Sequence, residues 1–105
     1  MLVEFRIIPV GTGEETKELV AKTLAIVEKS ELDYQLTAMG TLLEGEWEEI
    51  TFVIKKCHDE IKQFSERVVT EIVIDDRKDV KNRLKGSVLE VEYVLGKSLQ
   101  TGGLT

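Results

Sequence analysis

The chain has 105 residues, of which 42% are hydrophobic and 32% are charged. This length predicts a single small domain with one core, and the composition argues against a disordered chain. The net charge of −6, from 14 basic and 20 acidic residues, disfavours nucleic acids and anionic membranes as partners, because both require a basic surface. A neutral or cationic small ligand is compatible with this charge.

The sequence also bears on membrane insertion, secretion and disulfide formation. Its apolar runs are only a few residues long, so no membrane-spanning helix is predicted. Glu4 and Arg6 stand where a signal peptide requires an apolar stretch, and we therefore expect a cytoplasmic protein. The single cysteine, Cys57, excludes an internal disulfide and a cysteine-rich metal site.

The first third of the chain predicts a strand and a helix. Residues 2–10 alternate as a strand does, and we expect Pro9 to interrupt regular pairing because proline has no N–H to donate. After a glycine turn, Thr12 and Glu15 have the spacing of a capping box for a helix over residues 14–30. The apolar stripe of this helix consists of Leu19, Val20, Thr23, Leu24 and Val27.

The middle of the chain predicts a hairpin and a second helix. The hairpin covers residues 33–46, with the reversal at Gly40. The helix covers residues 47–64 and begins among three glutamates, which favour the positive end of a helix dipole. Its apolar stripe consists of Ile50, Val53, Ile54, Cys57, Ile61 and Phe64.

The last third predicts a strand and a C-terminal helix. Residues 67–75 alternate regularly, as a strand does. Residues 81–95 fit either a helix or a strand, and Gly86 disfavours the helix; we interpret them as a helix that ends at Gly96. Its apolar positions are Val80, Leu84, Val88, Val91 and Leu95. Residues 98–105 are expected to form a flexible tail.

The order strand, helix, strand, strand, helix, strand, helix predicts an α+β fold. Two strand–helix–strand units of this length form a four-stranded antiparallel sheet with both main helices on one face. This is the ferredoxin-like βαββαβ sandwich with an additional C-terminal helix, and we expect residues 1–97 to form it as one domain.

The other face of such a sheet has no helix to cover it. Its side chains are too apolar to face water and too polar to form a core. They are Glu4, Arg6, Ile8, Gln35, Thr37, Met39, Glu44, Val69, Glu71 and Val73. A subunit interface explains this face, and so does a pocket between subunits in which carboxylates and hydroxyls hold a small polar ligand. Both explanations predict a homo-oligomer.

The titratable residues do not form a catalytic pattern. Cys57 and His58 are adjacent on a predicted helix and point about 100° apart, so they are not placed as a nucleophile and its base. Asp75 and Asp76 lack the further ligands that a divalent cation requires and are interpreted as a solvated turn. Trp47 is interpreted as packing or as an aromatic wall for a flat heterocycle. Binding is favoured over catalysis, and no metal or cofactor is predicted.

Four segments combine in a characteristic order. They read Val-Glu-Phe-Arg-Ile-Ile-Pro-Val-Gly-Thr-Gly from residue 3, Leu-Asp-Tyr-Gln-Leu-Thr-Ala-Met-Gly-Thr-Leu-Leu-Glu-Gly-Glu-Trp from residue 32, Lys-Lys-Cys-His from residue 55, and Arg-Val-Val-Thr-Glu-Ile-Val-Ile-Asp-Asp-Arg from residue 67. With these segments the chain resembles the small thiamine-binding proteins, relatives of bacterial thiamine and hydroxymethylpyrimidine uptake proteins. The resemblance extends to about Gly96.

This resemblance implies a ferredoxin-like subunit, dimers that assemble into tetramers, and a thiamine-type ligand near a subunit interface, without enzymatic activity. The positions that match family motifs are candidate ligand-binding residues: Thr37, Met39, Gly40, Thr41, Glu44, Gly45, Trp47 and Arg67. Ala38 stands where the family often has a proline.

Thiamine joins a cationic thiazolium to a flat aminopyrimidine, and the chain has residues suited to each part. Candidates are Glu4, Glu44 or Glu71 for the positive charge, Gln35 or Thr37 for the pyrimidine edge, and Trp47, Tyr34 or Met39 for apolar contact. An oligomeric regulatory or sensor domain that binds another metabolite and acts through a protein partner is an alternative function. A small enzyme that uses His58 or the Asp75–Asp76 pair is a third.

Overall fold

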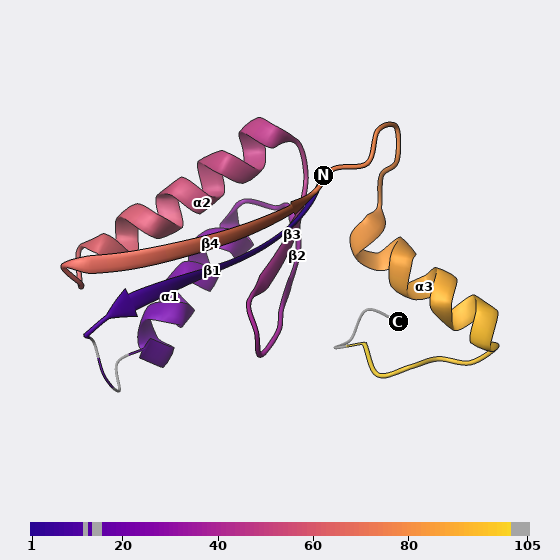
Figure 1. Ribbon diagram of the computed structural model, residues 1–105, viewed down its shortest axis with the longest axis horizontal. Coiled ribbons are helices and arrows are strands. Elements are labelled where there is room, and N and C mark those ends of the chain that lie inside the picture. Colours follow the sequence, from indigo (N-terminus) through magenta and orange to yellow (C-terminus); the bar gives the residue numbers. More distant parts are fainter. Residues whose placement is uncertain (12, 14–15, 102–105) are drawn as a thin grey trace.

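A computed structural model describes residues 1–11, 13 and 16–101 of the chain. The elements follow the predicted order β-α-β-β-α-β-α (Figure 1). The strands are β1 (Leu2–Val10), β2 (Asp33–Leu36), β3 (Thr41–Glu44) and β4 (Arg67–Asp75), and the helices are α1 (Thr16–Lys29), α2 (Trp47–Lys62) and α3 (Arg83–Leu95). The predicted α+β class is confirmed. The capping pair Thr12 and Glu15 and the predicted tail beyond Thr101 lie outside the described residues.

The four strands form one antiparallel sheet in the order β2-β3-β1-β4. β1 pairs with β4 along its whole length, from Leu2 to Val10. It pairs with β3 only from Leu2 to Phe5, because each hairpin strand has only 4 residues. The sheet therefore has a step, beyond which β1 has a strand neighbour on one side only (Figure 1).

The expectation that Pro9 interrupts strand pairing is wrong. Pro9 lies opposite Val68, and Val10 lies opposite Arg67, so the β1–β4 pairing continues to the end of the strand. Pro9 lies beyond the step, where β1 has the character of an edge strand. A proline is tolerated at such a position because no strand on the second side requires its missing N–H.

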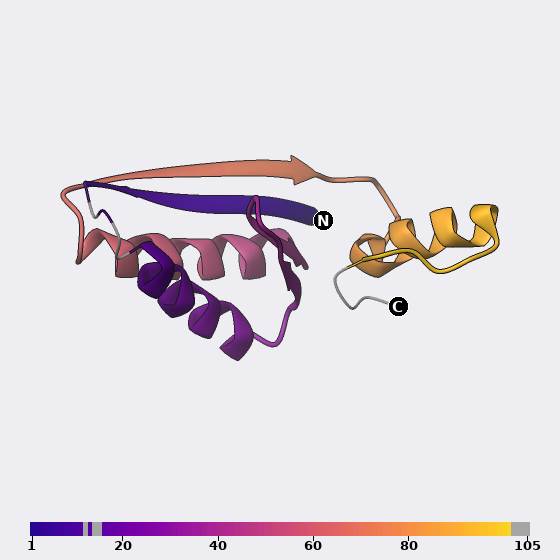
Figure 2. The ribbon, with the colours of Figure 1, turned by 90° about the horizontal axis from the view of Figure 1, so that it is seen from below.

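α1 and α2 lie together on one face of the sheet, as predicted (Figure 2). The core between them and the sheet consists of Val3, Phe5, Val27, Leu43, Ile50, Val53, Ile54 and Cys57. Each such side chain contributes about 1.5–3 kcal/mol through removal from water. The predicted helix stripes are buried except at their edges: Val20 is 36% exposed, and Phe64, which follows the end of α2, is 46% exposed.

α3 projects away from this sandwich (Figures 1 and 2). The helical interpretation of residues 81–95 is confirmed, and α3 ends at Gly96, whose left-handed φ of 75° suits glycine. Of the predicted apolar positions on α3 only Leu84 is buried. The chain then turns back: Gln35 Nε2 of β2 donates a hydrogen bond to the Thr101 carbonyl at 3.0 Å. None of the helices in the described part of the chain is long and apolar enough to cross a membrane.

Candidate functional site

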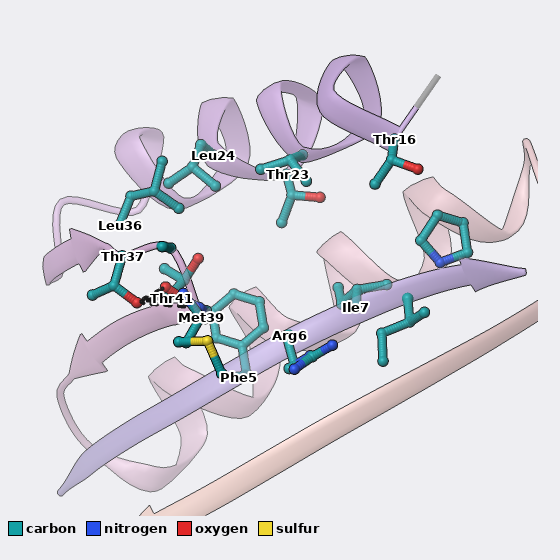
Figure 3. A pocket seen from close by; sticks show the side chains of 15 residues that line it. Phe5, Arg6, Ile7, Thr16, Thr23, Leu24, Leu36, Thr37, Met39 and Thr41 are labelled. Atoms are coloured by element: carbon teal, nitrogen blue, oxygen red, sulfur yellow. Dashed lines mark hydrogen bonds between the residues drawn. The ribbon is translucent and has the colours of Figure 1, made fainter. Parts of the chain in front are cut away.

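A pocket of about 440 Å³ lies at the step in the sheet, and we call it the hairpin pocket. β1 forms one wall, α1 forms the opposite wall, and the β2–β3 turn closes one end (Figure 3). The lining residues are Phe5–Pro9 from β1, Thr16, Val20, Thr23 and Leu24 from α1, and Leu36–Thr41 from the hairpin. The volume lies within the range of small-molecule sites, about 300–1,000 Å³.

The turn that closes the pocket is shaped by Thr37. Its hydroxyl accepts hydrogen bonds from the N–H groups of Met39 and Gly40, both at 3.1 Å, and donates to the Gly40 carbonyl at 2.9 Å. Side-chain hydroxyls stabilise turns in this way. A Cβ atom at Gly40 would stand 3.0 Å from the Phe5 carbonyl oxygen, so the turn approaches β1 too closely for a side chain. Met39 is held at the mouth of the pocket with 69% of its surface exposed.

Two buried threonines line the pocket, and their hydroxyls differ in what they bond. Thr23 is 6% exposed, and its hydroxyl donates to the Leu19 carbonyl at 3.1 Å. Thr41 is 5% exposed as a residue, and its hydroxyl makes no hydrogen bond to residues 1–11, 13 and 16–101; within these ranges Thr101 Oγ1, and not Thr41 Oγ1, is the fully buried side-chain atom without a partner, so the Thr41 oxygen is reached from the pocket. Thr41 is therefore available to a ligand.

The main chain of β1 adds further hydrogen-bonding groups. An antiparallel strand directs alternate peptide groups to its two sides. Residues 6–9 of β1 pair with β4 on one side, and within the described residues no strand faces them on the other. Some N–H and C=O groups of this stretch therefore face the pocket, and they suit the edge of a planar heterocycle with both donors and acceptors.

The structure thus brings together four of the eight predicted site residues. Thr37, Met39, Gly40 and Thr41 all line the hairpin pocket. The threonines of α1 and the free edge of β1 were not predicted. The sequence signal for them was the unequal length of the first strand and the two hairpin strands.

Glu44 and Gly45 lie at the other end of β3 and have connecting roles. The Glu44 carboxylate accepts hydrogen bonds from the N–H groups of Arg83 at 2.6 Å and Leu84 at 3.0 Å, so it caps α3. The Gly45 N–H donates to the Met1 carbonyl at 3.1 Å. Neither residue lines the hairpin pocket.

Trp47 and Arg67 also lie away from the pocket within one chain. Trp47 is 53% exposed and borders a separate groove between α2 and β4. Arg67 lies opposite Val10, at the far end of β1 from the β3 pairing. The predicted open face is confirmed on β1 and β4, where Arg6 and Glu71 form an ion pair at 3.6 Å. Thr37 and Met39 were expected on that face but lie in the turn after β2.

The groove, which we call the β4 groove, has a volume of about 450 Å³. It is lined by Met1, Val3, Trp47, Ile50, Thr51, Ile54, Lys55, His58, Thr70, Ile72 and Ile74. His58 Nδ1 lies 2.6 Å from the Thr70 hydroxyl, whereas Cys57 faces the core. Burial raises the pKa of the Cys57 thiol to about 11, so this cysteine is not a thiolate nucleophile near neutral pH. No group of three His, Cys, Asp or Glu residues that could hold a metal ion occurs in the described ranges.

Comparison with known proteins gives consistent results. Residues 3–92 match the family model described as thiamine-binding protein. The UPF0045 protein MJ1052 of Methanocaldococcus jannaschii is 35% identical over 85 residues, which cover 81% of this chain and 85% of that protein. The UPF0045 protein YqgV of Bacillus subtilis is 37% identical over 96 residues, which cover 86% of this chain and 92% of that protein.

Solved structures agree with these matches. The crystal structure of MJ1052 superposes with a TM-score of 0.75 at 32% identity, covering 91% of this chain and 95% of that one. A putative thiamine biosynthesis/salvage protein from Thermotoga maritima, TM0486, superposes with a TM-score of 0.72, covering 82% of this chain and 94% of that one; at 23% identity this likeness supports the fold. On the family match and the identity to MJ1052, the chain belongs to the thiamine-binding protein family.

Proposed function

We propose that the protein is a non-enzymatic binding protein that holds thiamine, or its hydroxymethylpyrimidine moiety, in the hairpin pocket. The observation that carries this proposal is the Thr41 hydroxyl, which lines the pocket and makes no hydrogen bond to the described residues, set beside the unpaired edge of β1. Family membership supports the ligand class.

The shape and chemistry of the pocket suit an aminopyrimidine. The ring presents donors and acceptors along its edge and apolar faces above and below. Thr41 and the β1 main chain supply partners for the edge, while Leu24, Leu36 and Met39 supply apolar contacts for the faces. Thr37 acts indirectly, because its hydroxyl is occupied in holding Met39 and Gly40.

Glu4 is the carboxylate that we assign to the thiazolium charge. Of the three candidates, Glu44 caps α3 and Glu71 pairs with Arg6. Glu4 adjoins the turn, since its Cγ would lie 3.5 Å from a Cβ atom at Gly40. The net charge of −6 also favours a cationic ligand over an anionic one.

The proposal includes a ferredoxin-like subunit and a homo-oligomer, either a dimer or a tetramer, with the pocket near a subunit interface. The sheet order β2-β3-β1-β4 with α1 and α2 on one face supports the fold assignment. Exposed apolar side chains support the oligomer: Val73 is 63% exposed, and Tyr93 and Val94 of α3 are more than 80% exposed. In such an assembly a second copy can bring Glu44, Gly45, Trp47 or Arg67 closer to the ligand.

The projecting α3 favours one alternative function. Its exposed apolar side chains suit a different protein as partner, as a regulatory or sensor domain for another metabolite requires. The ligand profile separates the two functions. Heterocyclic cations and pyrimidines support the first, and amino acids or nucleotides support the second.

Isothermal titration with thiamine, thiamine phosphates and hydroxymethylpyrimidine tests the proposal. Thr41→Val retains the side-chain shape and removes the hydroxyl, and it should weaken binding about tenfold. The matched control is Thr51→Val on α2, which lies outside the pocket and should bind as the parent does. Unchanged affinity in Thr41→Val, or no binding of any of these compounds by the parent, would contradict the proposal.

Glu4→Gln tests the charge assignment with the ligands as internal controls. The variant should bind thiamine about two- to fivefold more weakly, because an exposed ion pair contributes about 0.2–1 kcal/mol. It should bind the uncharged hydroxymethylpyrimidine as the parent does. Equal weakening of both ligands would show that Glu4 shapes the pocket and does not offset the charge.

A further inference from the structure

Arg6 is the one charged side chain among the described residues that line the hairpin pocket (Figure 3). The other lining residues are apolar residues, threonines and a glycine. A cation in an otherwise uncharged pocket indicates that part of the ligand carries negative charge. Thiamine itself carries only a positive charge, so it gives this arginine no partner.

The guanidinium of Arg6 has hydrogen-bonding capacity to spare. It makes no hydrogen bond to residues 1–11, 13 and 16–101, and its ion pair with Glu71 is a 3.6 Å contact between Nε and Oε2. The two side chains are 46% and 58% exposed, and exposed pairs of this kind contribute little to stability. A guanidinium has five N–H donors, so Arg6 can keep its contact with Glu71 and still bind a ligand through its terminal nitrogens.

We propose that the preferred ligand of the hairpin pocket is thiamine monophosphate and that Arg6 binds its phosphate. This inference rests on the proposed function, which places the pyrimidine ring in the pocket, and adds the chemical class that the pocket selects. The guanidinium matches a phosphate group because two parallel N–H groups reach two phosphate oxygens. Arg6 is therefore a specificity-determining residue of this site.

Glu4 and Arg6 place opposite charges at a spacing that suits this ligand. They are two residues apart on β1, so their side chains leave the same face of the sheet from Cα atoms about 7 Å apart. The hairpin turn reaches this face, because a Cβ atom at Gly40 would stand 3.5 Å from Glu4 Cγ. In thiamine monophosphate a two-carbon chain joins the thiazolium ring to the phosphate ester. The carboxylate and the guanidinium can thus bind the two charges of one ligand.

The net charge of −6 does not prevent binding of a phosphate at this position. Exposed charges that lie beyond a Debye length, about 8 Å at physiological salt, are largely screened, so the groups nearest the pocket decide the affinity. Arg6 is the cation among them. A second phosphate would find no further cationic side chain among the described lining residues, so the pocket favours the monophosphate over the diphosphate.

Isothermal titration of the full chain with thiamine, thiamine monophosphate and thiamine diphosphate tests this inference. The parent should bind the monophosphate about five- to tenfold more tightly than thiamine, and the diphosphate no more tightly than the monophosphate. A parent that binds thiamine as tightly as the monophosphate would overturn the inference and leave the proposed function standing. Binding of none of the three would contradict both.

Three variants test whether Arg6 carries the preference. Arg6→Gln should weaken binding of the monophosphate about five- to tenfold and leave thiamine binding unchanged, which also shows that the variant is folded. Glu71→Gln removes the acidic neighbour of Arg6 and should tighten binding of the monophosphate about twofold. The matched control is Arg77→Gln, which changes the net charge as Arg6→Gln does but lies outside the pocket, and it should bind both ligands as the parent does. Equal weakening of both ligands in Arg6→Gln would overturn the inference, because Arg6 would then shape the pocket without selecting phosphate.

Discussion

The hairpin pocket and the β4 groove have nearly the same volume, about 440 and 450 Å³, but they arise differently. The pocket forms where β3 ends before β1 does, so it contains main-chain edges and threonine hydroxyls. The groove forms where α2 covers β4 only in part, so it contains the sides of isoleucines and a tryptophan. Because β3 is shorter than β1, main-chain polar groups of β1 stay unpaired at the pocket. Because α2 covers β4 only in part, apolar side chains stay uncovered in the groove.

This difference leads to different occupants. Unpaired polar groups that line a pocket gain most from a small ligand that can bond them. An apolar groove beside a free strand edge gains most from a surface that covers it and extends the sheet. The hairpin pocket is therefore the site that we propose for thiamine.

Truncating one apolar side chain in the hairpin pocket and one in the β4 groove should give the largest difference in stability between the two sites. Phe5 lies at the hairpin pocket, is 1% exposed and belongs to the core, so Phe5→Ala should lower the free energy of unfolding by about 3–5 kcal/mol. Ile72 in the groove is 46% exposed, and Ile72→Ala should cost the monomer only about 1 kcal/mol. Urea unfolding of the parent and of both variants at low protein concentration measures these two losses in the free energy of unfolding. Similar losses of stability in Phe5→Ala and Ile72→Ala would contradict the assignment of Phe5, and with it this side of the pocket, to the hydrophobic core.

The sequence predicted β4 and α2, which border the β4 groove, better than it predicted the hairpin pocket. Strict alternation located β4 at its observed bounds, and helical spacing identified Ile50, Val53 and Cys57 as buried. These are local patterns. The pocket depends on the register that pairs Phe5 with Thr41 and leaves the rest of β1 free, which no single segment encodes. The role of Glu44 was missed for the same reason, because the N–H groups that it caps lie about forty residues away.

The next largest effect concerns the core behind the pocket, where Cys57 Sγ lies 3.7 Å from the Thr23 carbonyl. Burial raises the pKa of the thiol from 9.0 to about 11. Above pH 9 the unfolded chain releases a proton that the folded chain retains, so this contribution to stability is complete below pH 9 and is lost as pH rises to about 11. Cys57→Ala should remove the loss, which approaches about 1 kcal/mol per pH unit.

Urea unfolding of the parent and of Cys57→Ala at pH 7, 9 and 10.5 measures this difference. The offset between the two proteins at pH 7 reports the lost packing of the sulfur and is subtracted. A parent and a variant with parallel pH profiles would show that the thiol is more solvated than its position in the core indicates.

Two glycine substitutions test how rigidly the pocket turn is set. Gly40→Ala brings a Cβ atom to 3.0 Å from the Phe5 carbonyl oxygen, and because backbone cannot move aside cheaply, it should lower stability by about 1 kcal/mol and weaken thiamine binding. Gly86→Ala is the matched control. Its Cβ atom would stand 2.7 Å from a flexible Arg83 guanidinium nitrogen, and alanine favours the helix. A Gly40→Ala variant that binds thiamine like the parent would contradict the close approach of turn and strand.

The smallest effect lies on the outer surface of α2, next to the β4 groove. Lys55 Nζ donates to Asp59 Oδ2 at 2.6 Å, and this hydrogen bond lowers the pKa of the Asp59 carboxyl below its usual 3.8. A lowered carboxyl pKa stabilises the folded state above the ordinary value, and this contribution is lost as pH falls through the folded value. Both groups are solvated, so Lys55→Met should return the pKa of Asp59 toward its ordinary value, as measured by NMR titration, while the urea midpoint at pH 7 hardly changes. A large change in that midpoint would show that Lys55 supports the wall of the β4 groove through packing and not only through its charge.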